Sequence, residues 1–344
     1  MDGPRAAIRE ARLNLTLVTG ATGFLGKHVV RQLLDAGQAP LRVLNRGASA
    51  FDSDSRVEAV RGDVTMAPDV DRAVQGCRRI FHLAGMVSRL AGDADKMRQI
   101  HVEGTRLLLK AAQKLGIERV VVASSSGTVA VGRTDKMHTE ESGYKDAENA
   151  HWPYYVTKIA EEKLALEFHA ETKLPVVVVN PSLLLGPGDD RGSSTGDIVD
   201  FLEGQVLSAP AGGLNFVDVR DAAAGLIAAM ERGRAGERYL MGGPNWPCSQ
   251  LLRELAKLSG RPAPMMPSPT WLSLLMAPIL RKAMPLIGRK FTIDDQTIEM
   301  SGMYWYCDSS KAQRELGFKT RDPLETLRDT LEDIYTRRPE LKRP

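Results

Sequence analysis

A tyrosine and a lysine four residues apart carry the strongest chemical signal in this 344-residue chain. Tyr154 and Lys158 stand at the start of a segment with a helical pattern, so their i, i+4 spacing places both side chains on one helix face. A lysine ammonium beside a tyrosine favours the phenolate, which makes the hydroxyl a usable proton donor or acceptor nearer neutral pH. Tyr155 lacks this partner because Ile159 follows it at the same spacing.

Serine hydroxyls end an apolar run upstream of this pair, in the sequence RVVVASSSGT that starts at residue 119. If the run is a strand of a parallel sheet, its carboxyl end lines the ligand crevice. A serine at that point polarises a carbonyl oxygen by donating a hydrogen bond to it, although a lone serine is also common in ordinary turns and helix caps. Serine, tyrosine and lysine in this order predict proton transfer at an alcohol or carbonyl group.

A glycine turn near the N-terminus supplies an element that would hold a cofactor beside these groups. The segment LTLVTGATGFLG, residues 15–26, starts as a short apolar strand and continues with Gly20, Gly23 and Gly26 at G-x-x-G-x-x-G spacing. An amphipathic helical pattern follows directly. Strand, glycine turn and helix form the context of a dinucleotide-binding fingerprint, in which the backbone approaches the pyrophosphate and the helix N-terminus faces its charge.

Apolar strand patterns alternate with helical patterns through the first half of the chain. The strand patterns cover residues 41–45, 57–63, 79–85, 119–125 and 175–184, and the helical patterns cover 69–76, 96–115 and 154–172. Such alternation indicates a parallel sheet with helices on both faces. We therefore expect an α/β protein with a Rossmann-type doubly wound parallel sheet over residues 14–185, after a loose N-terminal extension at 1–13.

The pattern changes after residue 186. A Gly/Asp/Ser-rich loop is followed by shorter elements and many prolines, which predicts a smaller C-terminal lobe over 186–344 that shapes a substrate site. Residues 216–233 within it look like a strand and a helix that return to the large domain.

The composition argues against several kinds of partner. The net charge is only +3, and no run of Lys or Arg suggests nucleic-acid binding. Three scattered cysteines without C-x-x-C spacing are typical of reduced thiols in a cytoplasmic protein, and we expect no metal site. The first residues carry no apolar signal-peptide segment.

The most apolar stretch of the chain is TWLSLLMAPILRKAMPLIG, residues 270–288. Its prolines and basic residues make it a poor membrane span. Three roles fit the stretch: a core or dimer helix, a lid over an apolar substrate, or a contact with a membrane surface. Pro278 and Pro285 favour a lid built of short pieces, and we expect Trp271 and Leu275 to contact an apolar substrate.

Over residues 14–330, these motifs resemble the extended short-chain dehydrogenases/reductases, in the NAD(P)-dependent epimerase/dehydratase group. TGATGFLG matches the family's T-G-x-x-G-x-x-G, and ASSSGT resembles its catalytic serine strand. The resemblance implies that Ser125, or alternatively Ser126, acts with Tyr154 and Lys158 in catalysis. GDV at 62–64, HLAG at 82–85 and NPSLLLGPGD at 180–189 resemble further cofactor-binding segments. The cofactor-binding residues so implied are Gly20, Thr22, Gly23, Phe24, Leu25, Gly26, Asp63, Val64, Ala84, Gly85, Tyr154, Lys158, Pro181 and Ser182.

One motif departs from the family pattern. The family usually carries N-V-x-G-T before the serine strand, and this chain has HVEGT at 101–105. His101 thus replaces an asparagine that helps to hold the active-site helix and its water. It either makes the same hydrogen bond or is a solvated helix residue.

The end of the second strand pattern bears on the choice of cofactor. An acidic residue usually meets the ribose 2′-hydroxyl of NAD at this point, but the sequence is LNRGAS, with Asn45 and Arg46 and no carboxylate. Arg46 can pair with a 2′-phosphate, and Lys27 adds positive charge beside the glycine turn. NADP(H) is therefore favoured, while a plain surface role for Arg46 would leave the choice of cofactor relaxed, with NAD(H) also possible.

Together, these features predict an oxidoreductase that reduces a ketone on a mainly apolar small molecule, of secondary-metabolite, steroid-like or β-keto lipid type. NADPH would give the hydride and Tyr154 the proton, as in dihydroflavonol reductase-like and 3β-hydroxysteroid dehydrogenase-like members. Two alternatives stay open: a nucleotide-sugar epimerase or dehydratase with the same three residues, and a non-catalytic NADP-binding scaffold or sensor. We expect a monomer or a homodimer.

Overall fold

A computed structural model describes residues 15–264, 266–288 and 291–342, so the expected extension at 1–13 lies outside the described residues. Its main layer is a seven-stranded sheet in the order β10-β6-β5-β4-β1-β2-β3, parallel at every pairing. The strands are β1 (Thr16–Thr19), β2 (Leu41–Asn45), β3 (Val57–Arg61), β4 (Arg79–His82), β5 (Arg119–Ala123), β6 (Val176–Pro181) and β10 (Arg238–Met241). The structure confirms the predicted Rossmann-type α/β fold.

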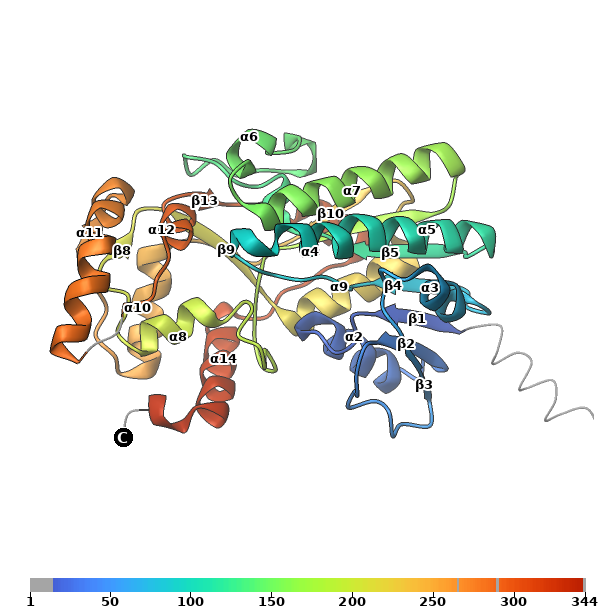
Figure 1. Cartoon of the computed structure of the whole chain (residues 1–344), viewed down its shortest axis with the longest axis horizontal. Helices are drawn as coiled ribbons and strands as arrows, with labels where there is room; N and C mark the ends of the chain where they lie inside the picture. Colours follow the sequence, from blue (N-terminus) through green and yellow to red (C-terminus); the bar gives the residue numbers. More distant parts are fainter. Residues whose placement is uncertain (1–14, 265, 289–290, 343–344) are drawn as a thin grey trace, which may run out of the picture.

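Helices cover both faces of this sheet (Figure 1). On one face, α2 (Phe24–Asp35) packs against α9 (Val219–Arg232) in one apolar core. On the other face, α3 (Ala67–Val74), α5 (Thr105–Lys114) and α7 (Pro153–Thr172) form a second core. Because both faces are covered, the strands are apolar along their length: VVVVNP of β6 is buried at every position.

The predicted helix over 96–115 is continuous but irregular in its middle. Helix α4 (Ala94–Arg98) leads through a π-helical segment, Gln99–Gly104, into α5. Segments of this kind often accompany functional sites. Here the π-helical segment carries His101, which bonds to α7.

A smaller lobe is built largely from the C-terminal half of the chain. Its sheet centres on β9 (Gly213–Asp218), which pairs with β7 (Leu183–Leu185), β11 (Asn245–Pro247) and β13 (Tyr304–Trp305). The lobe also contains the pair β8 (Ala209–Pro210) and β12 (Pro267–Ser268), and the helices α8 (Gly196–Leu202), α10 (Cys248–Ser259), α11 (Thr270–Ala283), α12 (Asp295–Ser301) and α14 (Pro323–Arg337). Two short helices, α6 (Asp146–Asn149) and α13 (Ser310–Leu316), complete the described set.

The segment 216–233 divides between the two sheets. Helix α9 packs on the seven-stranded sheet as expected, but residues 216–218 belong to β9 of the small sheet, which corrects the expectation of a returning strand. The reason is that Phe216 packs with Leu185 and Leu251 in the core of the lobe. The strand that returns to the large sheet is β10, at its edge.

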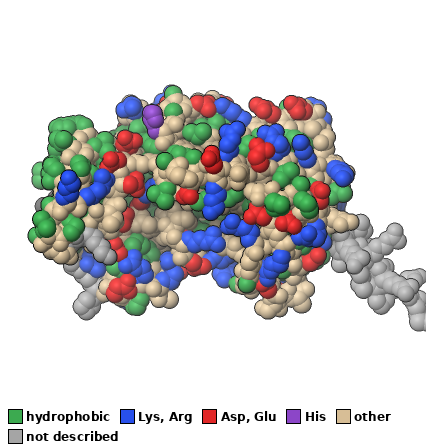
Figure 2. Space-filling model, in the orientation of Figure 1, with side chains coloured by type: hydrophobic (Ala, Val, Ile, Leu, Met, Phe, Trp, Pro, Cys, Tyr) green, Lys and Arg blue, Asp and Glu red, His purple; other side chains and the backbone are tan. Residues whose placement is uncertain are grey.

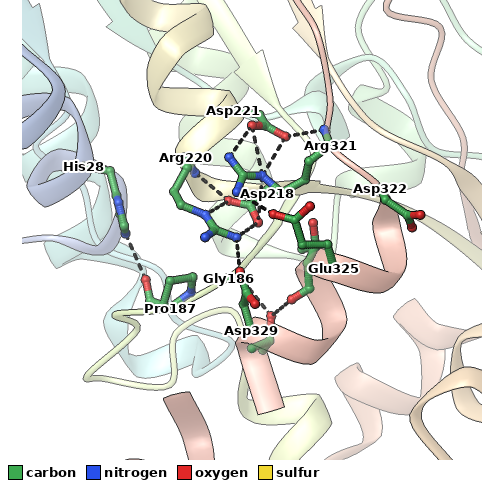
Figure 3. Close-up of polar contacts among 12 residues, drawn as sticks. His28, Gly186, Pro187, Asp218, Arg220, Asp221, Arg321, Asp322, Glu325 and Asp329 are labelled. Carbon is green, nitrogen blue, oxygen red and sulfur yellow. Dashed lines mark hydrogen bonds and ion pairs between the residues drawn. The ribbon is translucent and has the colours of Figure 1, made fainter. Parts of the chain in front are cut away.

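An ionic junction ties α9 to the lobe (Figure 3). The buried carboxylate of Asp218 accepts hydrogen bonds of 2.7 to 2.8 Å from the backbone and guanidinium of Arg220, which also pairs with Asp329 of α14. Arg321, which precedes α14, pairs with Asp221 of α9. Burial is the largest influence and raises the pKa of Asp218, but the hydrogen bonds from Arg220 and the charges of both arginines together hold it below its usual range. The junction therefore needs an ionised Asp218.

Residues 270–288 form a helix and a 3₁₀ segment, not the short pieces expected from their prolines. Helix α11 continues through Pro278, and Pro285 falls in the first turn of the 3₁₀ segment Met284–Ile287, where a missing N–H is harmless. Packing offsets the hydrogen bond lost at Pro278, because Ala277 is fully buried and α11 lies along α12. Among the described residues, no helix is long and apolar enough to cross a membrane.

Candidate active site

A cavity of about 1320 Å³ lies between the carboxyl ends of the large sheet and the lobe. This is the crevice where ligands bind in doubly wound sheets. The predicted residues that line it are Gly20, Thr22, Gly23, Phe24, Leu25, Gly26, Arg46, Gly85, Ser125, Tyr154, Lys158, Pro181 and Ser182. Asn45, Asp63, Val64 and Ala84 lie outside this lining.

The glycine turn packs its backbone closely against neighbouring backbone, at distances that a side chain would block. Gly20 has φ +71°, and a Cβ on it would lie 2.5 Å from the carbonyl oxygen of Leu83. A Cβ on Gly26 would lie 2.2 Å from the carbonyl oxygen of Gly20. At the opposite end of the crevice, the buried hydroxyl of Ser182 has no hydrogen-bond partner among the described residues. A side-chain-free turn at the start of α2 and a free polar atom beyond it fit a dinucleotide.

The predicted catalytic side chains meet at the carboxyl end of β5. Helix α7 starts with a proline, whose fixed φ suits the first turn, and this start sets Tyr154 beside the strand end. The hydroxyl groups of Tyr154 and Ser125 share a hydrogen bond, whereas the alternative, Ser126, is buried in the 3₁₀ turn that follows. Lys158 lies one turn further along α7 and donates to the carbonyl oxygen of Ala123 at 2.9 Å.

The electrostatics of Tyr154 differ from the expectation. Burial is the largest effect and raises the pKa of its hydroxyl, the charge of Glu161 raises it further, and the Ser125 hydrogen bond lowers it. The net direction is upward, which corrects the expected lowering by Lys158. The main physical reason is burial of the hydroxyl, which disfavours the charged phenolate. In addition, Lys158 Nζ donates to Glu161 Oε2 at 2.7 Å, so a carboxylate offsets its positive charge.

Two glutamates of α7 belong to the site and were missed by the sequence analysis. Glu161 and Glu162 are both fully buried, where unpaired carboxylates would be strongly destabilising. Glu161 accepts from Lys158 and from the hydroxyl of Thr105, while Glu162 accepts from the hydroxyl of Ser124 at 2.6 Å. The signal for them was an acidic pair three and four residues after the lysine, on a helix expected to pack on the sheet.

A chain of hydrogen bonds runs from the glycine turn to Lys158. Thr19 Oγ1 bonds His82 Nδ1 at 2.8 Å, and His82 Nε2 bonds Thr105 Oγ1 at 2.9 Å. Because Thr105 gives its one proton to Glu161, His82 must donate from Nε2 and accept at Nδ1. Burial, and then the charge of Lys158, lower the pKa of His82 to about 3, so the ring is neutral. This chain fixes Glu161, and through it Lys158.

His101 is fully buried, which rules out the solvated role. Its Nε2 accepts the N–H of Met86 at 3.0 Å, so Nδ1 carries the proton and donates to the Thr157 hydroxyl at 2.9 Å. Its ring meets that of Tyr154 edge to face, with centroids 5.9 Å apart. Burial, and then the charge of Lys158, lower the pKa of His101 to about 2. His101 therefore acts as a neutral brace between the loop after β4 and the start of α7.

The residues predicted for the adenosine end lie at the ends of β2 and β3. Arg46 lines the cavity with an exposed guanidinium, whose Nη1 lies 3.9 Å from Asp63 Oδ2. Asn45 is buried, and neither atom of its amide has a hydrogen-bond partner among the described residues. Val64 instead packs in the core below α5, with its side chain against Gly104.

Lys27 is not free beside the glycine turn. Its ammonium pairs with Asp190, from the loop after β7. The positive charge that Lys27 was expected to add beside the glycine turn is thus already matched by the carboxylate of Asp190. Ala84, which follows β4, is joined to the end of β1, because its N–H donates to Thr19 Oγ1 at 3.2 Å.

The lobe side of the cavity is largely apolar. Its lining includes Leu214, Leu251, Leu272, Met276, Leu280 and Met300. Leu272, Met276 and Leu280 come from one face of α11, at i, i+4 spacing. Trp271 and Leu275 are exposed on another face and do not line the cavity, which corrects their expected contact with substrate.

Ionic and hydrogen bonds of Arg89 join the Rossmann side of the cavity to its lobe side. Arg89, in the loop after β4, donates to both carboxylate oxygens of Asp197 of α8, at 2.8 and 2.9 Å. It also donates to the hydroxyl of Thr297 of α12, at 3.0 Å. A two-pronged contact of this kind holds orientation as well as distance.

The comparison with known families agrees with this geometry. The model of the NAD dependent epimerase/dehydratase family matches residues 16–242. The chain belongs to this family. It is therefore an extended short-chain dehydrogenase/reductase, an oxidoreductase whose family depends on a nicotinamide dinucleotide, as the sequence motifs predicted.

Individual relatives within the family are similar over nearly the whole chain. The putative dihydroflavonol 4-reductase of Synechocystis sp. is 35% identical over 321 residues, 91% of this chain and 92% of the relative. Sterol demethylase protein B of Methylococcus capsulatus is 34% identical over 318 residues, 88% and 92% of the two chains. The crystal structure of gox2253 has a TM-score of 0.81 at 28% identity and covers 96% of this chain and 100% of its own. The relatives thus include a member named as a reductase.

Proposed function

We propose that this extended short-chain dehydrogenase/reductase uses NADPH to reduce a ketone on a mainly apolar small molecule. The observation that carries the proposal is the division of the cavity into two walls. One wall presents Ser125, Tyr154 and Lys158, and the other presents apolar side chains of the lobe. An apolar ring or chain gains from desolvation against such a wall, whereas a diphosphate would lose its hydration against the apolar side chains.

Ser125, Tyr154 and Lys158, together called the catalytic corner, are arranged for proton donation to a carbonyl oxygen. Bound NADPH supplies the hydride to the carbonyl carbon. Ser125 orients the carbonyl oxygen by a hydrogen bond, and Tyr154 gives its proton to the oxygen as negative charge develops there, so the ketone becomes an alcohol. Burial raises the pKa of Tyr154 above its ordinary value, so its hydroxyl is protonated at neutral pH and available as the proton donor.

The two halves of the chain would divide the work. Residues 14–185 would hold the dinucleotide, with the glycine turn at its pyrophosphate, Ser182 near its nicotinamide and Lys158 at its ribose hydroxyls. Residues 186–344 would mainly hold the substrate. The relatives named after a dihydroflavonol and a sterol support an apolar ring system as the substrate.

Arg46 supports NADPH rather than NADH. Its exposed guanidinium stands at the end of β2, where an NAD enzyme usually carries a carboxylate. A planar guanidinium suits the oxygens of a 2′-phosphate. Relaxed use of NADH is the alternative, because Asp63 lies near enough to weaken the pairing.

A second candidate is epimerisation or dehydration of a nucleotide sugar, which the family name favours. A panel assay separates the two functions. Purified enzyme is mixed with NADPH or NADH and with flavonoid or steroid ketones on one side and nucleotide sugars on the other, and cofactor oxidation and sugar products are measured. Net NADPH oxidation by an apolar ketone is the expected result. Conversion of a nucleotide sugar without net cofactor use, together with inert ketones, would contradict the proposal.

A further inference from the structure

The outward face of α11 is apolar and exposed. Eight of the fifteen large hydrophobic side chains that are exposed among the described residues lie within residues 266–287. Trp271, Leu275 and Ile279 follow one another at i, i+4 spacing and are 67%, 61% and 54% exposed. The outer patch is defined here as Trp271, Leu275 and Ile279 of α11 together with Leu286 and Ile287 of the following 3₁₀ segment. Figure 2 shows hydrophobic side chains gathered at the end of the molecule where α11 lies in Figure 1.

The stretch of sequence that contains the outer patch is basic. The sequence from Met266 to Ile293 contains two Arg and two Lys, and no Asp or Glu. Lys282 is exposed at the end of α11 and forms no ion pair within the described residues, while Arg281 beside it pairs with Asp295 at 2.6 Å. An apolar helix face with basic flanks is the pattern of helices that lie in an anionic lipid interface.

The geometry excludes a spanning role and disfavours a second copy of the chain. Helix α11 has 14 residues, too few to cross a bilayer, so it would lie in the plane of the surface. A neighbouring face of the helix is already used, since Leu272, Met276 and Leu280 line the cavity. Anionic headgroups would neutralise Lys282, whereas the outer patch of a second copy consists of apolar residues and offers no opposite charge.

We infer that the outer patch docks the enzyme on an anionic lipid surface, with α11 lying in the headgroup region. The indole of Trp271, at the start of the helix, is the kind of side chain that prefers this depth. The docked helix would then lie between the lipid and the cavity, which its Leu272, Met276 and Leu280 line. The surface is independent of the proposed reaction, because docking needs neither cofactor nor substrate.

Vesicle flotation of the full chain tests this inference. The enzyme is mixed with vesicles of phosphatidylcholine alone or of phosphatidylcholine with phosphatidylglycerol, without cofactor or substrate. We expect binding to the mixed vesicles that weakens as salt is added, and much weaker binding to phosphatidylcholine alone. Absence of binding to both kinds of vesicle would overturn the inference.

Matched variants locate the contact. The triple change Trp271→Ser, Leu275→Ser and Ile279→Ser should lower binding to the mixed vesicles by at least about tenfold, because it removes most of the apolar area of the patch. The control changes Met66→Ser and Leu115→Ser, at exposed positions on the Rossmann half, should leave vesicle binding unchanged. Equal loss in both variants would reject α11 as the docking element.

A spectroscopic variant keeps the test valid if the triple variant fails to fold. Trp271→Phe preserves an apolar side chain and should still bind vesicles. The blue shift of tryptophan fluorescence on vesicle addition should be present in the natural protein and absent in Trp271→Phe. Sedimentation in solution tests the alternative that a second copy of the chain covers the patch. A dimer that the triple change splits, combined with no vesicle binding, would assign the patch to a second copy and overturn the inference.

Discussion

The two walls of the cavity are held together in different ways. On the Rossmann wall, the polar groups of the candidate site are fixed by partners: Lys158 by Glu161, Tyr154 by Ser125, and the brace His101 by Thr157. On the lobe wall, α11 contributes apolar side chains whose contacts are not directional. Proton transfer depends steeply on geometry, whereas burial of an apolar substrate depends mainly on area. The difference teaches that changes at the proton-transfer groups of the Rossmann wall should act on turnover, changes at its cofactor end on cofactor affinity, and changes on the lobe wall on substrate affinity.

The largest effect is expected at the proton donor. Tyr154→Phe keeps the ring but removes the hydroxyl, so turnover should fall by at least about 100-fold while NADPH affinity is retained. Steady-state kinetics with an accepted ketone, beside a cofactor titration, measure the two quantities. Tyr155→Phe is the matched control and should lose far less. Near-normal turnover in Tyr154→Phe would remove the tyrosine from the mechanism.

The next effect concerns the cofactor end of the Rossmann wall. Arg46→Ala should weaken NADPH binding about tenfold and change NADH binding little, because only NADPH carries a phosphate on the 2′-oxygen. Fluorescence titration with both cofactors measures this, and Arg56→Ala, a surface arginine paired with Asp54, is the control. A natural preference for NADH, or an equal loss for both cofactors, would refute the role of Arg46.

The lobe wall should respond in the Michaelis constant. Met276→Ser removes apolar area from the cavity and should raise the KM for an apolar ketone about fivefold at nearly unchanged kcat. Leu275→Ser, one residue away on the exposed face of the same helix, should leave both constants for a dissolved ketone unchanged. If kcat falls as much as KM rises in Met276→Ser, the division of labour between the walls is wrong.

The smallest expected effect concerns the influence of Glu161 on the pKa of Tyr154. Glu161 raises the pKa of Tyr154, so Glu161→Gln should lower that pKa. Reduction needs the protonated hydroxyl, so the fall of activity at alkaline pH should move to lower pH, by about one unit or less. The matched control is Glu162→Gln, which removes an adjacent buried carboxylate that bonds Ser124 instead of Lys158. An alkaline limb that stays in place, or that moves equally in the control, would show that Glu161 has no electrostatic effect on Tyr154.

Much of the Rossmann half could be predicted because its signals are local. Residues 41–45 were expected as a strand and form β2, and the helix expected over 154–172 is α7 from Pro153 to Thr172. Strand periodicity, the glycine turn and the i, i+4 pair of Tyr154 and Lys158 all lie within short windows of sequence. The lobe was harder, since β9 is only assigned by its pairing with three strands from distant parts of the chain.

α11 shows the same limit within one helix. Its prolines suggested short pieces, but burial of Ala277 and packing along α12 keep it continuous through Pro278. The sequence also did not predict which apolar side chains of α11 face the cavity. The whole stretch is apolar, so a helical pattern alone does not mark the buried face. Leu272 lines the cavity and Trp271, its neighbour in sequence, does not.

The sequence by itself determined the family and the parallel sheet, and it predicts Ser125, Tyr154 and Lys158 as the catalytic groups, because each of these inferences rests on residue types at fixed short spacings. Only the tertiary structure decided how those groups are ionised. The Glu161 carboxylate offsets the charge of Lys158, and His82 and His101 are neutral because burial removes the water that would stabilise their charged forms. These ionisation states depend on burial and on contacts between segments that are distant in the sequence, and a pattern in the sequence shows neither burial nor such contacts.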